Sequence, residues 1–268
     1  MLRGVPYVVS LRGGDVPGTE PDLEQVHLAL TPIRRWVLRG ATAVVANSEG
    51  LRSLSEKADP FPVSVIPNGV DTAVFLPGSS RQGQEFRFVF VGRLNTQKNV
   101  ALLLAAAEQL QKDVAIPFRV TIVGDGPLVN GLRSEAAARG LLAVVDWQPW
   151  IARTSMPSCL ASVDCLVNPS LYEGMPNCVL EAMACGLPVI ASDVAGNADL
   201  VAHEQTGLLF RSGDKLGLAS AMRRVLEGRD AALAWGRTGR ATVEKHYSWS
   251  AAANAYVRLF RPAAIEAS

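Results

Sequence analysis

Two basic residues that follow an apolar segment could together bind a phosphate. The run Arg87–Val91 predicts a buried strand that ends at Gly92 and Arg93, and Lys98 directly precedes a helix expected over Asn99–Asp113. Gly92 lets an anion approach the backbone closely, Arg93 can donate two parallel hydrogen bonds, and Lys98 adds a compact charge. Each charge-assisted contact contributes about 1.5–3 kcal/mol. The spacing predicts an anion site, with two solvated surface cations as the alternative.

Two glutamates supply a different chemistry. Glu173 lies in a loop with Gly174 and Pro176 after the apolar run Cys165–Asn168, and Glu181 falls inside the helix that follows. Parallel sheets bind ligands beyond the carboxyl ends of their strands, so these acids and the two cations would face one crevice. Carboxylates repel phosphate but accept hydrogen bonds from hydroxyl groups. A ligand with phosphates and several hydroxyls, such as a nucleotide sugar, would satisfy both kinds of side chain.

A second glycine turn narrows the classes of cofactor. Gly124–Pro127 follows an apolar strand, but Val129 stands where a dinucleotide fingerprint needs its third glycine. The sequence therefore gives little support to a nicotinamide or flavin enzyme. A tight turn with Pro127 at the first helical position explains these glycines as well as ligand contact does.

The elements that position these residues alternate in type. Short β-branched runs alternate with stretches rich in Ala, Leu, Glu and Arg, which predicts a parallel α/β fold. Several runs are apolar throughout, as in sheets covered by helices on both faces. The expected strands are Pro6–Ser10, Ala43–Ala46, Val63–Ile66, Arg87–Val91, Arg119–Val123, Val144–Trp147, Cys165–Asn168 and Pro188–Ser192. The main expected helices are Asn99–Asp113, Leu128–Arg139, Asn177–Cys185, Lys215–Glu227 and Ala231–His246.

A segment rich in Gly, Pro and Ser divides the chain into two α/β units. Residues 76–85 read LPGSSRQGQE, which predicts a linker over residues 77–85. We expect a partial N-terminal domain over residues 1–76, a complete doubly wound domain over residues 86–246, and a closing helix within residues 247–268.

Composition excludes several classes of protein. The 268 residues are 49% hydrophobic and 19% charged with a net charge of +1, which argues against a disordered chain and against a nucleic-acid-binding protein. The four cysteines form no Cys-x-x-Cys pair, so we expect reduced thiols rather than a metal or redox site. The longest apolar run is too short to cross a bilayer, and no leader pattern precedes the first strand. These features favour a cytoplasmic protein.

Several segments, taken in order, resemble one enzyme family. They are Ile66–Asp71, Val91–Leu94 with Lys98, Gly124–Pro127, Glu173–Glu181 and Ala184–Asp193. Together they resemble the retaining family 4 glycosyltransferases of GT-B fold, over nearly the whole chain. The resemblance implies two Rossmann-like domains. It also implies transfer of a sugar from a UDP- or GDP-sugar to an acceptor hydroxyl, with retention of the anomeric configuration.

The resemblance further implies roles for individual residues. Arg93 and Lys98 would bind the donor diphosphate, Glu173 would contact the donor sugar, and Glu181 would hold the ribose hydroxyls. Trp150 would line the nucleobase pocket, or would be a core aromatic. No metal or other cofactor is expected, because cations and a helix dipole stabilise the departing diphosphate. The donor-binding segment would also include Gly92, Gly174, Met175, Pro176 and Asn177.

The match is weakest near the N-terminus. Members of the family begin with further strands and helices that carry much of the acceptor site, and these are not in the sequence. Arg12 stands where many members have a histidine, and is interpreted as an acceptor-side residue that acts through its backbone or as a loop cation. Asp15 could orient an acceptor hydroxyl. Three strands alone would expose a sheet edge and an apolar face, so a partner chain could supply the rest.

A basic amphipathic helix is expected over His27–Gly40, with Arg34, Arg35 and Arg39. Such a helix can lie on an anionic bilayer, which would place the protein on the inner face of a membrane, or can be an ordinary solvated helix. The last helix, Trp249–Phe260, is expected to cross back toward the first domain.

Two other functions stay open. A non-catalytic module or inactive fragment would bind a nucleotide sugar without turnover, and a structural α/β domain would bind no nucleotide. The acceptor is a sugar, lipid or small molecule that the sequence does not identify.

Overall fold

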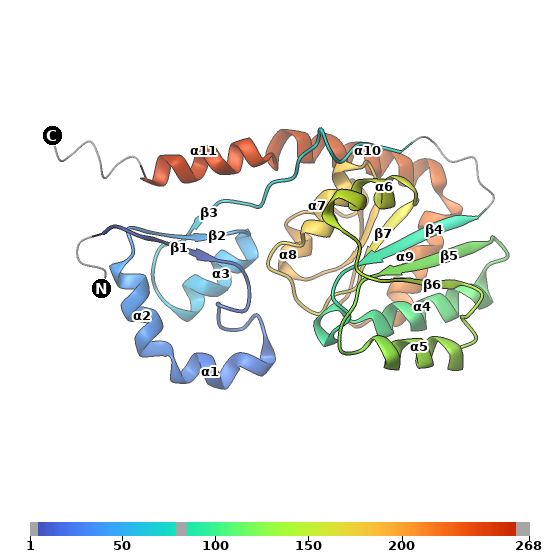
Figure 1. Cartoon of the computed structure of the whole chain (residues 1–268), viewed down its shortest axis with the longest axis horizontal. Helices are drawn as coiled ribbons and strands as arrows, with labels where there is room; N and C mark the ends of the chain where they lie inside the picture. Colours follow the sequence, from blue (N-terminus) through green and yellow to red (C-terminus); the bar gives the residue numbers. More distant parts are fainter. Residues whose placement is uncertain (1–4, 79–84, 261–268) are drawn as a thin grey trace.

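The chain folds into two lobes, each built on a parallel sheet (Figure 1). The computed structural model describes residues 5–78 and 85–260, so residues 79–84 of the expected linker lie outside the described residues. The smaller sheet has the order β1-β2-β3 and the larger sheet has the order β6-β5-β4-β7-β8-β9, which confirms the predicted α/β class. The strands are β1 (Val8–Leu11), β2 (Ala43–Ala46), β3 (Ser64–Val65), β4 (Phe86–Val91), β5 (Phe118–Val123), β6 (Val145–Gln148), β7 (Cys165–Asn168), β8 (Val189–Ser192) and β9 (Gly207–Phe210).

The strand order of the larger sheet creates a crevice. Strand β4 lies between β5 and β7, so the chain runs outward from β4 in one direction through β5 and β6 and in the other through β7, β8 and β9. At such a switch point the loops that follow adjacent strands diverge and leave a crevice at the carboxyl ends. Phe88 of β4 is in register with Cys165 of β7. The segment with Lys98 follows β4 and the segment with Glu173 follows β7.

Helices cover both faces of the larger sheet (Figure 1). Along β4, Phe88 and Phe90 belong to one core cluster with α4, while Val89 and Val91 belong to a second cluster with α7. Burial on both faces explains why residues 88–91 of the strand form a continuous apolar run. One face is covered by α4 (Val100–Asp113), α5 (Val129–Ala138) and α9 (Lys215–Glu227), and the other by α6 (Met156–Ala161), α7 (Asn177–Ala184) and α10 (Arg229–His246).

Two expectations about elements are wrong. Strand β9 is not among the predicted strands, because four residues that begin with Gly207 carry too weak a pattern. The single helix expected over His27–Gly40 is two helices, α1 (Glu24–Ala29) and α2 (Thr31–Gly40). Pro32 has no N–H to donate to the preceding turn, so α1 ends and a new helix begins.

Two elements join the smaller lobe to the larger one. Helix α11 (Trp249–Phe260) follows α10 of the larger lobe and runs along the smaller lobe (Figure 1), where it packs Ala252 against Val45 and Ile66. The short helix α8 (Ala195–Ala198), which follows β8, contacts α3 (Glu49–Ala58) of the smaller lobe. Short 3-10 turns η1 (Pro21–Leu23), η2 (Thr96–Lys98) and η3 (Arg153–Ser155) lie in the loops. No helix within residues 5–78 and 85–260 is both long and apolar enough to cross a membrane.

Candidate active site

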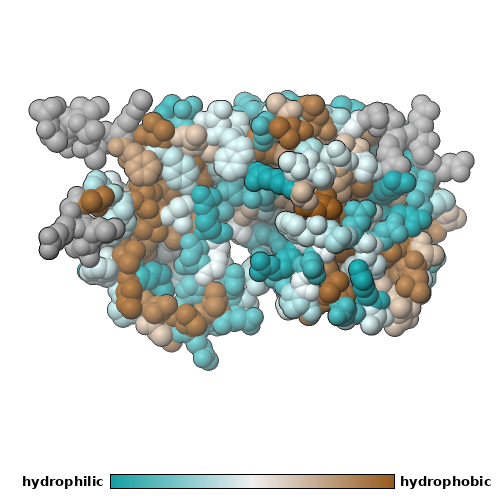
Figure 2. Space-filling model, in the orientation of Figure 1, coloured by the Kyte–Doolittle hydropathy of each residue, from teal (hydrophilic) through white to brown (hydrophobic). Residues whose placement is uncertain are grey.

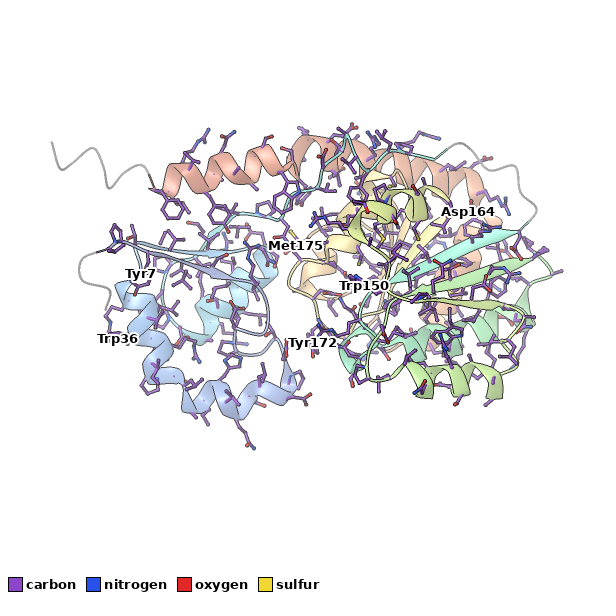
Figure 3. The ribbon with its side chains drawn as sticks, viewed as in Figure 1. Tyr7, Trp36, Trp150, Asp164, Tyr172 and Met175 are labelled. Carbon is purple, nitrogen blue, oxygen red and sulfur yellow. The ribbon has the colours of Figure 1, made fainter. Side chains whose placement is uncertain are left out.

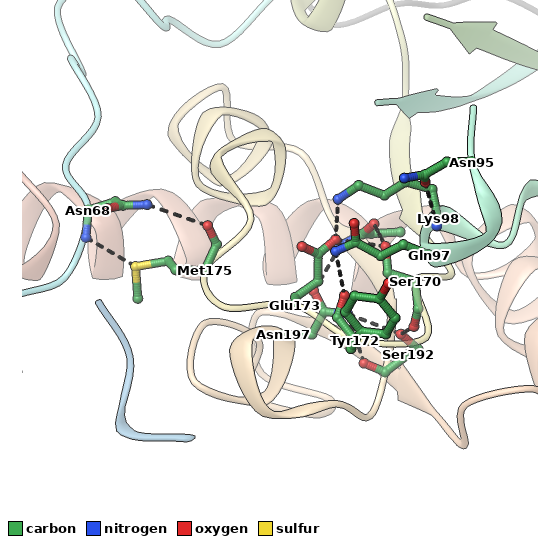
Figure 4. Close-up of polar contacts among 11 residues, drawn as sticks. Asn68, Asn95, Gln97, Lys98, Ser170, Tyr172, Glu173, Met175, Ser192 and Asn197 are labelled. Carbon is green, nitrogen blue, oxygen red and sulfur yellow. Dashed lines mark hydrogen bonds and ion pairs between the residues drawn. The ribbon is translucent and has the colours of Figure 1, made fainter. Parts of the chain in front are cut away.

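An ion pair between Lys98 and Glu173 lies between the loops that follow β4 and β7 (Figure 4). Lys98 Nζ is 2.5 Å from Glu173 Oε1, and the two side chains are 16% and 6% exposed. Burial lowers the pKa of Lys98, but the charge of Glu173, with smaller contributions from Cys178 and Tyr172, raises it above 10.5 overall. Lys98 is therefore charged at neutral pH. An ammonium group has three N–H donors, so pairing with Glu173 leaves two for a ligand.

Backbone and side-chain contacts hold the two loops together. The side chain of Asn95 accepts the N–H of Lys98 at 3.2 Å and caps η2. Gln97 Nε2 donates to the carbonyl of Tyr172 at 3.0 Å, and the Gln97 carbonyl accepts the N–H of Leu171 at 2.8 Å. The loop after β4 is thus fixed to the loop after β7 beside the ion pair.

Buried polar side chains form hydrogen bonds that hold the Glu173 carboxylate in place. Ser170 Oγ lies 2.7 Å from Glu173 Oε1 and 2.9 Å from Asn168 Oδ1, so its one proton has two acceptors. Asn168 Nδ2 lies 3.4 Å from Glu173 Oε1 and donates to Asn197 Oδ1 at 2.9 Å. Asn197 Nδ2 in turn donates to the carbonyl of Ser192 at 3.0 Å. Asn168, Ser170, Ser192 and Asn197 are each at most 1% exposed. The carboxylate is therefore fixed by a buried hydrogen-bond network.

Glu181 lies within α7 and is half-buried. Burial raises its pKa to about 6, against the opposing charge of Arg153. Its carboxylate has no hydrogen-bond partner among the residues that the structure describes. A carboxylate that is partly desolvated and unpaired is ready to accept hydrogen bonds from the hydroxyls of a ligand.

Three other residues predicted to bind the donor are Arg93, Gly92 and Trp150, and the structure places them differently around the carboxyl edge of the larger sheet. Arg93 follows β4 but is exposed, and its side chain makes no ion pair or hydrogen bond with the described residues, so the structure does not join it to Lys98. The carbonyl of Gly92 packs against Gly124. A Cβ added to Gly124 would lie 1.9 Å from the carbonyl oxygen of Gly92. Trp150 is 63% exposed, so the core-aromatic interpretation is wrong (Figure 3).

The smaller lobe meets the loop after Glu173. A Cβ on Gly174 would lie 2.5 Å from the carbonyl oxygen of Arg12, so only glycine fits between the lobes here. Arg12 Nη1 donates to Asn68 Oδ1 at 2.6 Å, and Asn68 Nδ2 donates to Asn177 Oδ1 at 2.9 Å. The N–H of Asn68 approaches Met175 Sδ at 3.2 Å (Figure 4). Arg12 is thus tied to the donor-side loop through Asn68.

Asp15 and Pro176 stand apart from the ion pair. Asp15 accepts the backbone N–H groups of Arg12 and Gly13, at 2.9 Å and 2.7 Å, so its carboxylate shapes its own loop. Pro176 is buried and directly precedes α7.

Sequence reasoning missed four residues of this site, namely Asn68, Ser170, Asn168 and Asn197. All are small polar residues; Asn68, Ser170 and Asn168 lie at strand ends or in loops, where such types are common for local reasons, and Asn197 lies in the short helix α8. Asn68 falls within Ile66–Asp71, one of the segments that resemble the family, but no pattern in the sequence indicates its contact with Asn177.

Two cavities of the structure lie away from these residues. One of about 260 Å³ is lined by Phe86, Leu187, Pro188 and Leu233, near the amino ends of β4 and β8. Another of about 330 Å³ lies beside Arg87, Arg119 and Asp146. Neither includes Lys98, Glu173 or Glu181, so we place the candidate site by its chemistry at the open carboxyl edge. Within residues 5–78 and 85–260, no cluster of three His, Cys, Asp or Glu side chains could hold a metal ion.

Comparison with known families shows to which family the chain belongs. Residues 75–242 match the family described as Glycosyl transferases group 1, and residues 1–74 match the family described as Glycosyltransferase Family 4. The chain belongs to the group 1 glycosyltransferases. The family expected from the ordered motifs is therefore confirmed.

Curated relatives are also glycosyltransferases or synthases. The chain is 36% identical over 186 residues to the UDP-Gal:alpha-D-GlcNAc-diphosphoundecaprenol alpha-1,3-galactosyltransferase of Escherichia coli. The aligned region covers 64% of this chain and 47% of that protein. The chain is 29% identical over 291 aligned residues to the alpha-maltose-1-phosphate synthase of Mycolicibacterium smegmatis, which covers 97% of the chain and 74% of that protein. The chain thus spans about half the length of the first relative and about three quarters of the second.

Solved glycosyltransferase structures share the fold. HepE from Anabaena, in complex with UDP and glucose, matches with a TM-score of 0.83 at 21% identity, over 95% of this chain and 71% of that chain. Sucrose-phosphate synthase from Thermosynechococcus elongatus matches with a TM-score of 0.84 at 26% identity, over 98% of this chain and 69% of that chain. These matches confirm the GT-B fold that the sequence predicts.

Proposed function

We propose that this protein transfers a hexosyl group from a UDP- or GDP-sugar to an acceptor hydroxyl with retention of the anomeric configuration. The observation that carries the proposal is the buried Lys98–Glu173 pair at the carboxyl edge of the larger sheet, with the unpaired Glu181 in the adjoining helix. Cationic donors suit a diphosphate and carboxylates suit sugar hydroxyls, so one nucleotide sugar would engage all three. One relative whose name includes UDP-Gal, and a structural neighbour in complex with UDP and glucose, support the same ligand class.

In this proposal the charges act on the leaving group. The bond between the anomeric carbon and the β-phosphate oxygen breaks, and the acceptor oxygen bonds to the same face of that carbon. The acceptor proton passes to the departing diphosphate oxygen. Lys98, Arg93 and the N-terminal turn of α7 stabilise the charge that develops on the diphosphate, and Glu173 orients the sugar. Trp150, exposed after β6, would stack on the nucleobase.

A donor-turnover assay tests the function. The purified chain is incubated with UDP- and GDP-sugars, and released nucleoside diphosphate is measured with and without acceptor mixtures and with EDTA. Release of UDP or GDP that survives EDTA is expected, because side-chain cations rather than a metal ion carry the leaving-group charge. Binding of the donor without any release would favour the non-catalytic module, and absence of nucleotide binding would favour the structural domain.

Replacing Arg93 by alanine should weaken donor binding and slow turnover. The side chain of Arg93 has no ion-pair or hydrogen-bond partner among the described residues, so its truncation breaks no such contact, while one charge-assisted contact to phosphate contributes about 1.5–3 kcal/mol. We expect the Kd for UDP to rise by about 10-fold to 100-fold in titration calorimetry. Arg39→Ala, an exposed arginine on α2, is the matched control. Equal UDP affinity in both variants would place the diphosphate elsewhere.

Donor affinity should depend on pH through Glu181. The pKa of Glu181 is raised to about 6, and its ionised form is the one that accepts hydrogen bonds from ribose hydroxyls. Affinity is therefore highest above pH 6 and falls below it, by up to about 10-fold per pH unit. UDP-glucose is the right probe because its diphosphate, esterified at both ends, does not titrate near pH 6. Glu181→Gln should bind more weakly at pH 7 and show a flat profile. A flat wild-type profile would contradict the ribose role.

Exposed apolar side chains on α1, on α2 and on Leu30 between them form a separate surface of the smaller lobe (Figure 2). They are Val26, Leu28, Leu30, Ile33 and Trp36, each between 46% and 78% exposed.

Two of the three arginines of the expected basic helix face are already paired with a carboxylate of the same lobe. Arg34 Nε and Arg35 Nε lie 2.5 Å and 2.7 Å from the carboxylate of the buried Asp59. Burial of Asp59 raises its pKa, but the hydrogen bonds and charges of the two arginines lower it overall. Any contact of this surface with lipid would thus rest on its apolar side chains and Arg39.

We propose peripheral contact between this apolar surface and a lipid membrane. The wild-type chain should co-sediment with vesicles, and Leu28→Glu should reduce the bound fraction by about 3-fold or more. Leu216→Glu, at a 62% exposed leucine on α9 of the other lobe, is the control. If neither wild type nor variant binds vesicles, a covering partner chain becomes the preferred explanation of this surface.

A further inference from the structure

The short helix α8 lies between the smaller lobe and the loop that carries Glu173. On one side, the backbone N–H of Gly196 donates to the carbonyl of Glu173 at 3.3 Å, and a Cβ on Gly196 would lie 2.4 Å from the carbonyl oxygen of Gly174. On the other side, a Cβ on Gly50 of α3 would lie 2.3 Å from the Cβ of Ala195. Asp199, directly after α8, accepts the N–H of Gly50 at 3.0 Å.

One residue of α8, Asn197, is also linked to the Glu173 carboxylate by a series of side-chain hydrogen bonds. Asn197 is fully buried and accepts a hydrogen bond from Asn168, whose amide also approaches Glu173 Oε1. The other end of the Asn197 amide is fixed by Ser192, through its carbonyl at 3.0 Å and its hydroxyl at 3.1 Å. Asn197 therefore sets the orientation of Asn168, and Asn168 and Ser170 set the orientation of Glu173 (Figure 4).

We infer that Asn197 is a positioning residue for Glu173, and that α8 transmits the contact with α3 of the smaller lobe to the Glu173 carboxylate. The inference rests on the proposed function, because it assigns to Glu173 a role in orienting the donor sugar. It adds a mechanical consequence: the sugar subsite is correctly formed only when the smaller lobe rests on α8. Nucleotide binding, which uses the larger lobe alone, does not require that contact.

Burial makes this chain of contacts sensitive to a single deletion. The Asn168 amide is 1% exposed, so loss of Asn197 leaves one of its N–H groups without a partner and without water. The amide is then free to turn toward Glu173 and to displace its carboxylate from Lys98. Polar groups in a dry environment cannot compensate by small shifts toward solvent.

Two variants and their double mutant test the inference. Asn197→Ala removes the buried link, and Gly50→Ala pushes α8 from the side of the smaller lobe without touching any residue near Glu173. Thr206→Val, at another buried polar residue of the larger lobe, is the control for the first, and Gly131→Ala, where a Cβ meets nothing within 4 Å, is the control for the second. UDP affinity, UDP-glucose affinity and donor turnover are measured for each.

We expect Asn197→Ala and Gly50→Ala each to lower turnover by about 10-fold and to remove the affinity that glucose adds to UDP, with the Kd for UDP itself within about 2-fold of wild type. The double mutant should be no worse than about 10-fold, because both changes act through one link. Unchanged turnover in either single variant would overturn the inference. Multiplied losses in the double mutant would overturn the connection through α8.

A crystal structure of Asn197→Ala separates this inference from the proposed function. If the wild-type chain shows no turnover, the proposed function fails, but the positioning role still predicts that Glu173 Oε1 moves well beyond hydrogen-bond distance of Lys98 Nζ in the variant. An unmoved carboxylate would overturn the inference whatever the activity of the wild type.

Discussion

Replacing Lys98 by methionine should abolish most of the donor turnover while the chain stays folded. The ammonium group both pairs with Glu173 and, in the proposed reaction, neutralises the leaving diphosphate. Loss of one preorganised donor to a developing charge costs about 10²–10³-fold in rate. We expect a loss of this size in a coupled assay of nucleoside diphosphate release, together with a Kd for UDP raised by at least about 10-fold.

The same substitution leaves Glu173 buried without its counter-ion. Breaking a buried pair by removing one partner destabilises a protein by about 3–5 kcal/mol, and Ser170 and Asn168 would offset part of that cost. Lys112→Met is the matched control, since Lys112 also pairs with a glutamate but is 62% exposed. Exposed pairs contribute about 0.2–1 kcal/mol, so Lys112→Met should keep wild-type activity and stability. A Lys98→Met chain that turns over donor at the wild-type rate would remove Lys98 from the mechanism.

Replacing Gly174 by alanine should uncouple the two lobes. The new Cβ would lie 2.5 Å from the carbonyl oxygen of Arg12, which is a backbone atom and cannot rotate aside as the end of a flexible side chain could. Either the smaller lobe or the loop with Glu173 must shift. Because a displacement of about 1 Å in a catalytic group can cost 10²-fold, we expect turnover to fall by about that factor and by more than UDP affinity does.

A matched glycine gives the control for this experiment. Gly131 lies in α5, and a Cβ there would meet nothing within 4 Å. Gly131→Ala should leave turnover unchanged and stabilise the helix by about 0.5–1 kcal/mol. If Gly174→Ala matched Gly131→Ala in turnover, the close approach of Arg12 to the donor-side loop would have no part in the reaction.

The elements of the larger lobe could be predicted from sequence because burial leaves a strong pattern. Strands β4 and β5 are apolar over most of their length, and each is followed by a helix long enough to recognise. Their parallel order places the residues after every strand at one edge of the sheet. From that order, Lys98 and Glu173 are predicted to lie in the same crevice. The prediction assigns them to different parts of a ligand and does not include their ion pair.

Contacts between distant segments could not be predicted in this way. Asn68 meets Asn177 across 109 positions, and Asn168 meets Asn197 across 29. Each pairing depends on how two elements pack, which no local spacing records. Trp150 illustrates the same limit, because an aromatic residue after a strand fits a core or an open cleft equally well, and only the packed structure shows that it is exposed.

The central claim is that a nucleoside diphosphate sugar binds at the edge where Lys98, Glu173 and Glu181 meet, and a crystal structure with UDP-glucose tests it most directly. We predict the diphosphate beside Lys98 and Arg93, the sugar hydroxyls at Glu173 and the ribose at Glu181. Density for the nucleotide in the cavity near Phe86 and Leu187, or beside Arg87 and Arg119, would contradict the account.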